Sequence, residues 1–562
     1  MTYAAGHSRR LPADLEKEVA AIQARAADED WAGRLWSRDA SLWTGDEEVA
    51  ALIANRLGWL DLPTHFSDDV EALAAFARGV RDEGFDAALV CGMGGSSLAP
   101  DVLAASFGVT DGGIPVRILD STDPAAVAQA TAASDPARTL YLISSKSGTT
   151  TETLAFLAHF WQAEDDIHAD IPQGLAGQHF VAVTDPPPSL HAIPHSDLMR
   201  EVFLNPPDVG GRYSALSYVG LVPGALMGLD LRQMLDAAAQ MAEDTRSPSL
   251  DNPGVWLGAT LGALAKAGRD KLTLVIEPRV ARLGAWIEQL VAESTGKHGV
   301  GIVPVDGEGL GAPKSYGSDR VFVRISSGED ATWQASTTAA LDALAAAGHP
   351  VVDLATDAGI GGLGAEFFRW EFATAVAGIV LGINPFDEPN VTESKDNTKR
   401  VLEQFGRTGT VTLPAAIDPA SLDRHLKRVT PNGYFAIQAY IALSESRDRV
   451  LREAADALRD ATKQAVTVGY GPRFLHSTGQ LHKGGAPIGC FILLTAAHGD
   501  DLPIPGSHES FGTLIDAQAA GDFASLEAHG LPVARVDLGN DPDAGLEAFV
   551  TALRQALASP LE

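Results

Sequence analysis

Apolar positions along the chain change their spacing after about residue 85. Between residues 14 and 82 they recur every three or four residues, as in LEKEVAAIQARA and VEALAAFARGV, which predicts amphipathic helices. From there on, continuous apolar runs such as DAALVCG and TLYLI alternate with helical segments. Because a strand buried on both faces is apolar throughout, this alternation predicts a parallel sheet covered by helices on both sides.

The same alternation returns twice further along the chain. KLTLVIEP, DRVFVRIS and PVVDLA predict strands of a second unit, and IGCFILLTA predicts a strand of a third. We therefore expect an α/β fold with N-terminal helices and a doubly wound parallel sheet over residues 1–245, a second doubly wound unit over 246–405, and an extra C-terminal α/β unit over 406–562. LEAHGLPVARVDLG in the third unit resembles LAAAGHPVVDLA in the second, which indicates either a partial internal repeat or ordinary helix–turn–strand order.

Composition and charge limit the classes of partner. The 562 residues carry a net charge of −31, a surface that on average repels nucleic acid and acidic lipids. The chain has no uninterrupted apolar run of about 18 residues and its N-terminus is not a secretory signal, so we expect no membrane association. Cys91 and Cys490 are the only cysteines, which is typical of a reducing, cytoplasmic location.

A glycine-rich loop follows the first predicted strand. Gly94, Gly95 and Ser96 lie between that strand and a helix, where backbone N–H groups and the helix dipole attract an anion. Asp120 ends the next predicted strand, at the distance where a dinucleotide site places its ribose-binding acid. This loop is therefore compatible with a phosphate site, a dinucleotide site or a tight turn.

The next loop favours a monophosphate over a dinucleotide. The stretch from Ser144 to Thr151 offers six hydroxyls and the ammonium of Lys146, and it also opens a helix. Hydroxyls, N–H groups and a helix dipole together form a phosphate cup, and six hydroxyls exceed what helix capping needs. The sequence therefore predicts phosphate contacts from Ser145, Lys146, Ser147, Thr149 and Thr150.

Three further motifs carry charged side chains. Arg212 follows Gly210 and Gly211, which allow a sharp turn that presents a guanidinium to an anion formed during a reaction. Glu293 ends an apolar helix, where the helix dipole raises its pKa toward the range of a general base. Lys395 lies one turn into a helix that begins at Pro389.

These motifs together resemble the glucose-6-phosphate isomerases. GMGGSSLAP, SSKSGTTTET, GGRYSALS, ESTGK and INPFDEPNVTESK occur in the order typical of that family, over about residues 85–400. The resemblance implies two sugar-isomerase domains of the flavodoxin-like type, with the active site between them. It implies that Ser96, Ser145, Ser147 and Thr150 bind the phosphate. It further implies that Glu293 moves the proton between C2 and C1 through a cis-enediolate, that Arg212 stabilises this enediolate, and that Lys395 assists ring opening.

The sequence departs from the family pattern at two positions. Glu388 stands where the family usually has a glutamine that approaches the phosphate, so the role of this position is open. The family's catalytic histidine, roughly twenty residues after the base, has no counterpart in GEGLGAPKSYGSDR. The segment FLHSTGQ in the third unit resembles the missing one, as in the isomerase part of fused transaldolase/glucose-6-phosphate isomerase proteins. Our hypothesis is that His476 opens the ring, with His298 and His482 as competing candidates.

The resemblance implies an aldose–ketose isomerase that interconverts glucose 6-phosphate and fructose 6-phosphate in glycolysis and gluconeogenesis. A sugar-phosphate sensor without activity, a dual glucose/mannose-6-phosphate isomerase and a nicotinamide-dependent oxidoreductase are the alternatives. A sensor would need the phosphate cup but not Glu293, Arg212 and Lys395. We expect no metal and no cofactor, and either a homodimer or a pseudo-dimeric monomer.

Overall fold

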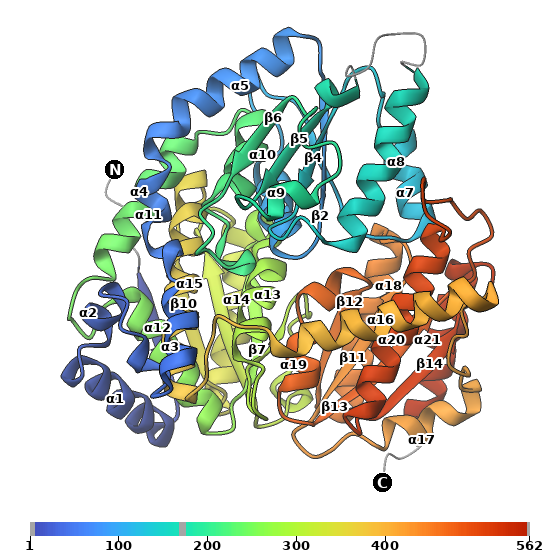
Figure 1. Ribbon diagram of the computed structural model, residues 1–562. Helices are drawn as coiled ribbons and strands as arrows, with labels where there is room; N and C mark the ends of the chain where they lie inside the picture. The colour runs from blue at the N-terminus through green and yellow to red at the C-terminus, as the bar shows by residue number, and fades with distance from the viewer. Residues whose placement is uncertain (1–5, 168–175, 559–562) are drawn as a thin grey trace.

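The computed structural model describes residues 6–167 and 176–558, so the outer ends of the first and third predicted units lie outside the described residues. Within these ranges the strands form three sheets (Figure 1). Each sheet consists of parallel strands, with one antiparallel exception at an edge. The predicted α/β class of doubly wound parallel sheets is confirmed.

The first sheet has the order β3-β2-β4-β5-β6. Its strands are β2 (Ala87–Gly92), β3 (Val116–Leu119), β4 (Thr139–Ser144), β5 (Phe180–Thr184) and β6 (Glu201–Leu204). One face packs on α5 (Val70–Asp82), α6 (Gly95–Phe107) and α10 (Tyr218–Leu226), and the other on α7 (Pro124–Ala132) and α8 (Thr151–Ile167). Alternate residues of β2 and β4 belong to two different hydrophobic cores, which explains their continuous apolar sequence.

The second sheet has the order β1-β10-β9-β7-β8. Its strands are β1 (His7–Arg10), β7 (Lys271–Ile276), β8 (Val303–Val305), β9 (Arg320–Ser326) and β10 (Val351–Ala355). Its helices are α11 (Leu231–Asp244), α12 (Pro253–Lys266), α13 (Leu283–Thr295), α14 (Ala331–Ala346) and α15 (Ile360–Leu381). Helix α15 is buried on nearly every side, as its apolar sequence predicts, and it packs against α11, α12 and α13.

The third sheet has the order β12-β11-β13-β14. Its strands are β11 (Tyr434–Tyr440), β12 (Ala465–Tyr470), β13 (Gly489–Thr495) and β14 (Val533–Asp537). One face packs on α17 (Leu422–Leu426), α18 (Glu445–Thr462) and α21 (Pro542–Ala558). The other packs on α19 (Gly479–Gly484) and α20 (Phe511–Ala528), and this core continues into β8 of the second sheet.

All three sheets share the same order for their first four strands. When the antiparallel strand β1 is left aside and the parallel strands of each sheet are numbered in chain order, the first four strands of each sheet have the spatial order 2-1-3-4, the order of flavodoxin-like folds. In such folds a ligand binds beyond the carboxyl ends of the first and third strands, where the chain leaves the sheet in opposite directions. The two hydroxyl- and glycine-rich loops of the sequence follow β2 and β4, which are these two strands of the first sheet.

The N-terminal helices lie mainly on the second unit. They are α1 (Ala13–Asp28), α2 (Trp31–Trp36), α3 (Glu47–Ala54) and α4 (Leu62–His65). Helix α1 packs on α12 and α4 on α11, while strand β1 pairs antiparallel with β10. The predicted range 1–245 therefore contributes to both sheets. The polar sequence HSRR of β1 gives no periodic indication of a strand, because it pairs only at the edge.

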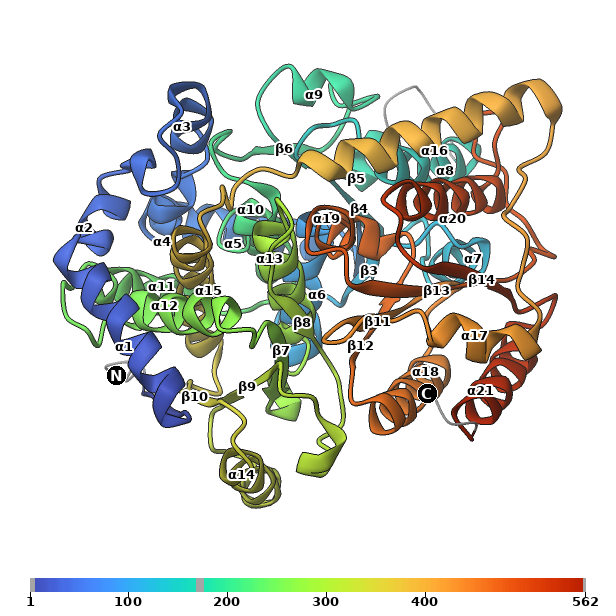
Figure 2. The ribbon, with the colours of Figure 1, turned by 90° about the horizontal axis from the view of Figure 1, so that it is seen from below.

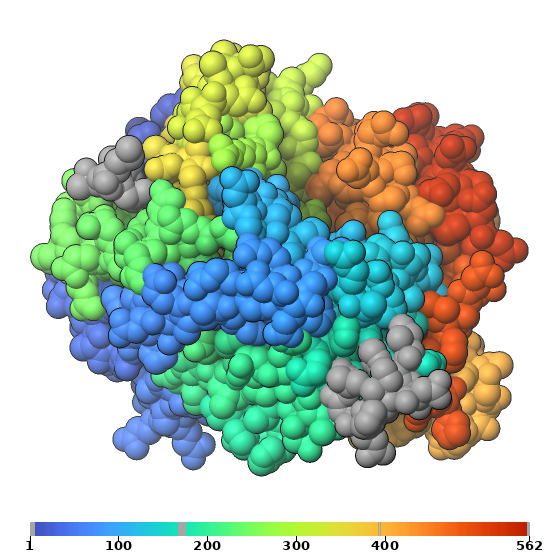
Figure 3. All heavy atoms as spheres, turned by 90° about the horizontal axis from the view of Figure 1, so that it is seen from above, coloured from blue at the N-terminus to red at the C-terminus, as the bar shows by residue number. Residues whose placement is uncertain are grey.

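Helix α16 (Pro389–Thr408) leaves the second unit and lies along α20 of the third (Figure 2). The predicted boundary at residue 405 would assign this helix, which carries Lys395, to the second unit. In the view from above, the third unit, in orange and red, lies against the first unit on the side away from the N-terminal helices (Figure 3). The third unit therefore contacts both other units. Among the described residues, no helix is long and apolar enough to cross a membrane.

Candidate active site

A cavity of about 600 Å³ lies beyond the carboxyl ends of β2 and β4. Loops from the first sheet form one wall, and residues of α13, α16 and the segment before α19 form the other. The cavity brings together most of the residues that the sequence predicted: Gly94, Gly95, Ser96, Lys146, Ser147, Thr150, Gly211, Arg212, Glu293, Lys395 and His476. Residues more than three hundred positions apart in the chain thus face the same space.

Two glycines bring the first loop close to its neighbours. Gly94 has a positive φ of 53°, and a Cβ atom there would lie 2.6 Å from the carbonyl oxygen of His476. A Cβ atom on Gly95 would lie 2.2 Å from the carbonyl oxygen of Gly211. Both distances are shorter than any ordinary contact, so only glycine allows these three segments to meet. The glycine loop therefore joins the GGRYS segment and the His476 segment at the cavity.

The hydroxyl-rich loop is divided between the cavity and the protein interior. Ser147 and Thr150 line the cavity, and the hydroxyl of Ser147 lies 3.0 Å from that of Thr149. The hydroxyl of Ser145 is 2.9 Å from that of Thr150 and is buried, so Ser145 holds the loop rather than facing the cavity. Helix α8 begins at Thr151, which directs its N-terminal N–H groups toward this end of the sheet.

Lys146 has partners within the protein. Its ammonium group donates to the Asp185 carboxylate and to the carbonyl oxygen of Pro207, the latter at 3.1 Å. Burial raises the pKa of Asp185 although Lys146 opposes this effect. Lys146 therefore lies in the cavity wall together with its counter-ion Asp185, and these two contacts fix its position.

Arg212 is buried and makes contacts on every side of its guanidinium. Its Nε donates to Ser294 Oγ at 2.8 Å, and its Nη2 donates to the carbonyl oxygens of Pro385 and Asp387 at 2.8 and 2.9 Å. Its Nη1 lies 3.5 Å from Glu293 Oε1 and donates to Glu388 Oε2 at 3.0 Å. Burial opposes the charge, but the two carboxylates outweigh it and raise the pKa of Arg212, so the cation is permanent.

Glu293 is the carboxylate that faces the cavity from the last turn of α13. Its side chain is 10% exposed, and Gln289 Nε2 donates to its Oε2 at 3.1 Å. Burial raises the pKa of Glu293, with Arg212 opposing this and Glu388 adding to it. The predicted direction is the same, but removal from water is the main cause here. A carboxylate with a raised pKa beside a fixed cation is suited to take up and release a proton.

Glu388 replaces the family's glutamine and pairs with Arg212 instead of being left without a counter-charge. The preceding segment is held by Lys297, whose ammonium donates to the Asn384 carbonyl oxygen at 2.7 Å and lies 2.9 Å from Asp387 Oδ1. Burial and the nearby Arg212 lower the pKa of Lys297 to about 8. Arg212 and Lys297 thus position the FDEP segment against α13.

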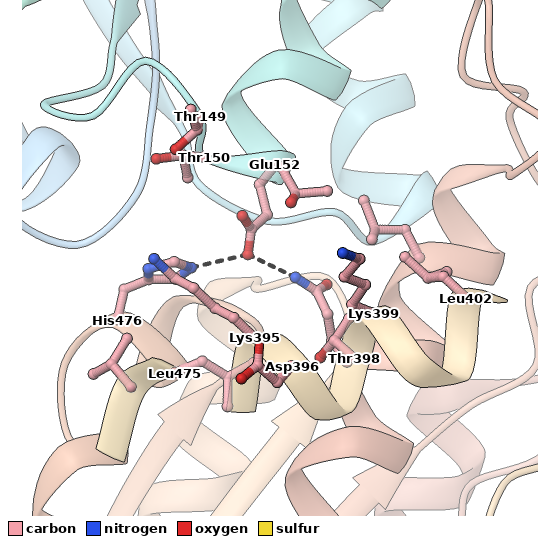
Figure 4. A pocket seen from close by; sticks show the side chains of 14 residues that line it. Thr149, Thr150, Glu152, Lys395, Asp396, Thr398, Lys399, Leu402, Leu475 and His476 are labelled. Carbon is pink, nitrogen blue, oxygen red and sulfur yellow. Dashed lines mark hydrogen bonds and ion pairs between the residues drawn. The ribbon is translucent and has the colours of Figure 1, made fainter. Parts of the chain in front are cut away.

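His476 enters the cavity from the third unit, at the end of η9 (Arg473–His476). Its Nε2 lies 2.9 Å from Glu152 Oε1, and its carbonyl oxygen accepts a hydrogen bond from Gln289 Nε2 at 2.6 Å. Figure 4 shows His476 and Lys395 on one side of Glu152. Burial would raise the pKa of Glu152, but His476 and Lys395 hold it below its usual value. Glu152 is thus an ionised partner that fixes the imidazole ring.

The two competing histidines lie elsewhere. His298 is exposed, in a turn with a positive φ of 53°, and is absent from the cavity wall. His482 is buried, its Nδ1 lies 2.8 Å from the Tyr434 hydroxyl, and burial lowers its pKa to about 3. Of these three histidines, only His476 lines the cavity.

Several residues of the site were not predicted from the sequence. Glu152, Gln289 and Arg56 contact or line the cavity, but a glutamate or glutamine on a helix has no pattern that marks it as functional. Asp120, the acid of the dinucleotide alternative, accepts a hydrogen bond from Ser97 and lies 3.3 Å from Arg473 Nε. Asp120 therefore helps to hold the His476 segment. In residues 6–167 and 176–558, no group of three or more His, Cys, Asp or Glu side chains is arranged to bind a metal ion.

A large part of this chain is similar in sequence to known isomerases. The family model for phosphoglucose isomerase matches residues 65–309, which include Arg212 and Glu293 but end before Lys395 and His476. A glucose-6-phosphate isomerase of Rubrobacter xylanophilus is 29% identical over 416 residues, covering 64% of this chain and 92% of that protein. One of Thermus thermophilus is 34% identical over 244 residues, covering 43% of this chain and 56% of that protein. The chain thus spans little more than half the length of the second relative.

Solved structures show the same fold. A hypothetical protein of Thermus thermophilus has a TM-score of 0.57 at 26% identity, covering 70% of this chain and 100% of that one. A glucose-6-phosphate isomerase of Chlamydia trachomatis has a TM-score of 0.51 at 22% identity, covering 67% of this chain and 78% of that one. In both comparisons about a third of this chain is left uncovered.

Proposed function

We propose that the chain is a member of the glucose-6-phosphate isomerase family, an aldose–ketose isomerase whose cavity interconverts glucose 6-phosphate and fructose 6-phosphate through Glu293. The observation that carries this proposal is the pair formed by Glu293 and Arg212. A buried carboxylate with a raised pKa lies 3.5 Å from a permanent cation, beside a loop built to accept an anion. A sugar-phosphate sensor would not need this pair.

The phosphate group binds at the carboxyl ends of β2 and β4. Ser96, Ser147 and Thr150 supply hydroxyls, while α6 and α8 begin at these loops and supply N–H groups. This placement directs the sugar carbons toward Glu293. Substrate specificity then depends on the opposite wall, where Glu388, Lys395 and His476 lie.

His476 and Lys395 assist opening of the sugar ring. The hydrogen bond from Nε2 to Glu152 leaves Nδ1 of His476 without a proton and free to accept the proton of the anomeric hydroxyl. Lys395 extends toward the same point in Figure 4, and its ammonium group donates the proton that the ring oxygen takes up as the C1–O bond breaks. Ring opening produces the free carbonyl compound on which the base acts.

Glu293 then transfers the proton between C2 and C1. It removes the proton from C2, which forms a cis-enediolate, and returns the proton to C1 while the hydroxyl proton of O2 passes to O1. Arg212 stabilises the negative charge that develops on the two oxygens. Preorganised cations at such a position and a positioned base each contribute about 10²–10⁴-fold to the rate.

The main test is turnover of fructose 6-phosphate and mannose 6-phosphate in coupled assays. Glu293→Gln is expected to reduce turnover of fructose 6-phosphate by at least about 10²-fold with nearly unchanged binding of the sugar phosphate. Mannose 6-phosphate turnover by the wild-type chain would extend the activity to a second aldose. A Glu293→Gln variant with near-normal turnover would overturn the proposal.

Ring opening is tested with a substrate that has no ring. In erythrose 4-phosphate the fourth oxygen carries the phosphate, so this aldose cannot close a five- or six-membered ring. His476→Ala is expected to lose turnover of glucose 6-phosphate but to retain C2 proton exchange on erythrose 4-phosphate. His298→Ala is the matched control, because His298 is exposed outside the cavity. Unchanged turnover of glucose 6-phosphate by His476→Ala would remove His476 from this role.

We further propose that one chain forms a complete site, without a residue from a second subunit. His476 reaches Glu152 of the first unit within the same chain, and Arg473 pairs with Asp101 at 2.7 Å to hold this contact. Specific activity is then expected to stay constant on dilution through any dissociation seen by light scattering. Loss of activity in parallel with dissociation would contradict this proposal.

A further inference from the structure

Glu152 accepts two hydrogen bonds at the same oxygen. His476 Nε2 lies 2.9 Å from Oε1, and Gln518 Nε2 of α20 donates to Oε1 at 2.6 Å. These are the two dashed lines that meet at Glu152 in Figure 4. Both Glu152 and Gln518 are buried, at 5% and 3% exposure. The carboxylate that holds His476 is therefore itself held by a residue of the third unit.

The orientation of the Gln518 amide is set from the first unit. The hydroxyl of Thr122 donates to Gln518 Oε1 at 2.8 Å, and Thr122 is fully buried. An amide whose oxygen accepts from a hydroxyl turns its NH₂ group to the opposite side. Here that side faces Glu152. Thr122, Gln518, Glu152 and His476 thus form one chain of hydrogen bonds that ends at the cavity.

We propose that Gln518 is a positioning residue for ring opening, which keeps Glu152 ionised and aimed at His476. This inference rests on the proposed function, because it requires His476 to act on the substrate. A neutral NH₂ donor stabilises the carboxylate without adding a charge. An ionised Glu152 in turn keeps the imidazole proton on Nε2 and leaves Nδ1 toward the substrate.

A small cavity explains why Glu152 needs this restraint. It has a volume of about 250 Å³, and its lining includes Glu152, Gln518 and Leu514. Figure 4 shows this cavity from close by, with Glu152 at its centre. This space allows the carboxylate to turn away from His476 once the amide is removed. The hydrogen bond from Gln518 Nε2 prevents this rotation of the Glu152 carboxylate.

The charged groups around Glu152 come from two other elements. His476 belongs to η9, while Lys395, Lys399 and Asp396 belong to α16 and line the same small cavity. Helix α20 contributes Gln518 and Leu514 to this cavity, and neither side chain is charged. His476 and Lys395 already favour the ionised carboxylate, so removal of Gln518 changes the pKa of Glu152 without removing all of its support.

The decisive variant is Gln518→Leu, which keeps the side-chain volume and removes the NH₂ donor. Turnover of glucose 6-phosphate is expected to fall about 10- to 100-fold, the usual effect of losing a hydrogen bond to a charged group. The acid limb of its pH profile is expected to move to higher pH, because Glu152 without a donor takes up a proton more readily. C2 proton exchange on erythrose 4-phosphate should stay at the wild-type rate.

Two further variants grade the effect. Gln518→Glu places a second carboxylate on Glu152, so the two share a proton and the acid limb moves further than in Gln518→Leu. Thr122→Val allows the Gln518 amide to rotate, because the hydrogen bond to its Oε1 is lost. It should move the acid limb of the pH profile to higher pH, but less than Gln518→Leu does. Asn397→Ala is the matched control, because it removes a bond from α16 to Ser525 of α20 that does not reach Glu152.

The outcomes separate this inference from the proposed function. An unchanged pH profile in Gln518→Leu, or an equal loss on the cyclic and the acyclic substrate, would overturn the role of Gln518. If His476→Ala leaves turnover of glucose 6-phosphate intact, the ring-opening role of His476 fails and this inference fails with it. A loss in His476→Ala together with an unshifted Gln518→Leu profile would reject only the inference.

Discussion

The first and second sheets have the same order of parallel strands, but different groups fill the space beyond their first and third strands. In the first sheet Gly94 and Gly95 follow β2, and the hydroxyl-rich loop after β4 faces the cavity. In the second sheet Glu277 follows β7, and a similar loop, Ser326 to Asp330, follows β9.

Glu277 occupies the second loop as an internal anion. Its Oε2 accepts hydrogen bonds from the backbone N–H groups of Ser327 and Gly328 and from the hydroxyls of Ser326 and Ser327. Its Oε1 accepts from the N–H group of Asp330 at 2.9 Å. Burial opposes the charge, but these bonds lower the pKa of Glu277. The loop after β4 thus faces an open cavity, whereas the donors of the loop after β9 are already hydrogen-bonded to Glu277.

The topology thus places an anion-binding loop at this end of each sheet, and the residue that follows the neighbouring strand decides whether that loop is open to a ligand. A glycine leaves room for a phosphate from outside. A glutamate fills the same space and converts a binding loop into a stabilising contact.

We call the space beyond the first and third parallel strands of the first sheet the first crevice, and the corresponding space of the second sheet the second crevice. The largest effect is expected at Arg212, which lies in the first crevice beside Glu293. Arg212→Met should reduce kcat/KM for fructose 6-phosphate by about 10²–10³-fold, because the developing charge loses its cation. Arg279→Met is the control in the second crevice, where Arg279 makes an exposed ion pair with Glu329. A coupled assay measures both. A decrease of less than tenfold in Arg212→Met would end the proposed role of Arg212 and weaken the contrast between the crevices.

The next effect is on stability and concerns Glu277. Glu277→Gln should lower the free energy of unfolding by about 2 kcal/mol, because several hydrogen bonds to a buried charge are lost. Activity should stay at the wild-type level. Urea denaturation followed by circular dichroism provides the measurement, and Glu329→Gln, an exposed glutamate of the same loop, is the control. Equal stability of both variants would mean that Glu277 is not a structural anion.

A smaller effect distinguishes the two glutamates by pH. The pKa of Glu277 is lowered, so its contribution to stability is present above the pKa of an unfolded glutamate and is lost as pH falls through the folded value. The pKa of Glu293 is raised, so its ionisation destabilises the folded chain as pH rises above the unfolded value.

The stability difference between the wild type and each variant should therefore change with pH in opposite ways. For Glu277→Gln the stability deficit should shrink as the pH falls below about 4, the pKa of an unfolded glutamate, whereas for Glu293→Gln a stability gain should grow as the pH rises above that value. Thermal midpoints below and above this pH measure both trends. Slopes of the same sign would show that the two carboxylates do not differ in the way described.

The smallest effect is expected for single hydroxyls. Ser147→Ala should raise the KM for fructose 6-phosphate by about two- to tenfold and reduce the stabilisation of the fold by inorganic phosphate. Ser327→Ala should leave the phosphate effect unchanged, because Glu277 already occupies that loop. Thermal shift with and without phosphate compares the two variants. A phosphate effect that depends on Ser327 would place a ligand site in the second crevice.

The sequence predicted the fold class through strands that lie in runs of mainly apolar residues. Strands β2, β4, β5, β7, β9 and β13 follow runs that need no partner to be recognised. Strand β1 could not be found in this way, since HSRR is polar and becomes a strand only by pairing with β10. Helix α16 was visible as a helix, but its packing on α20 depends on residues more than a hundred positions further along the chain.

Part of the candidate site was also visible. Loops rich in glycine or hydroxyls indicate anion binding because the chemistry lies within a few consecutive residues. The Glu277 loop shows the limit of that reasoning, since its Ser-Ser-Gly sequence also suggests an anion, and only the structure shows that the anion comes from the chain.

The local elements, the two loops rich in glycine or hydroxyls and the candidate residues Glu293, Arg212, Lys395 and His476 could all be found from the sequence. Their patterns are local, so they need no knowledge of the distant chain. The tertiary structure decided which loop stays open, which of three histidines reaches the cavity, and that Glu152 and Gln518 hold it. These features depend on contacts between units far apart in sequence, where burial and distance set the charge and direction of each side chain.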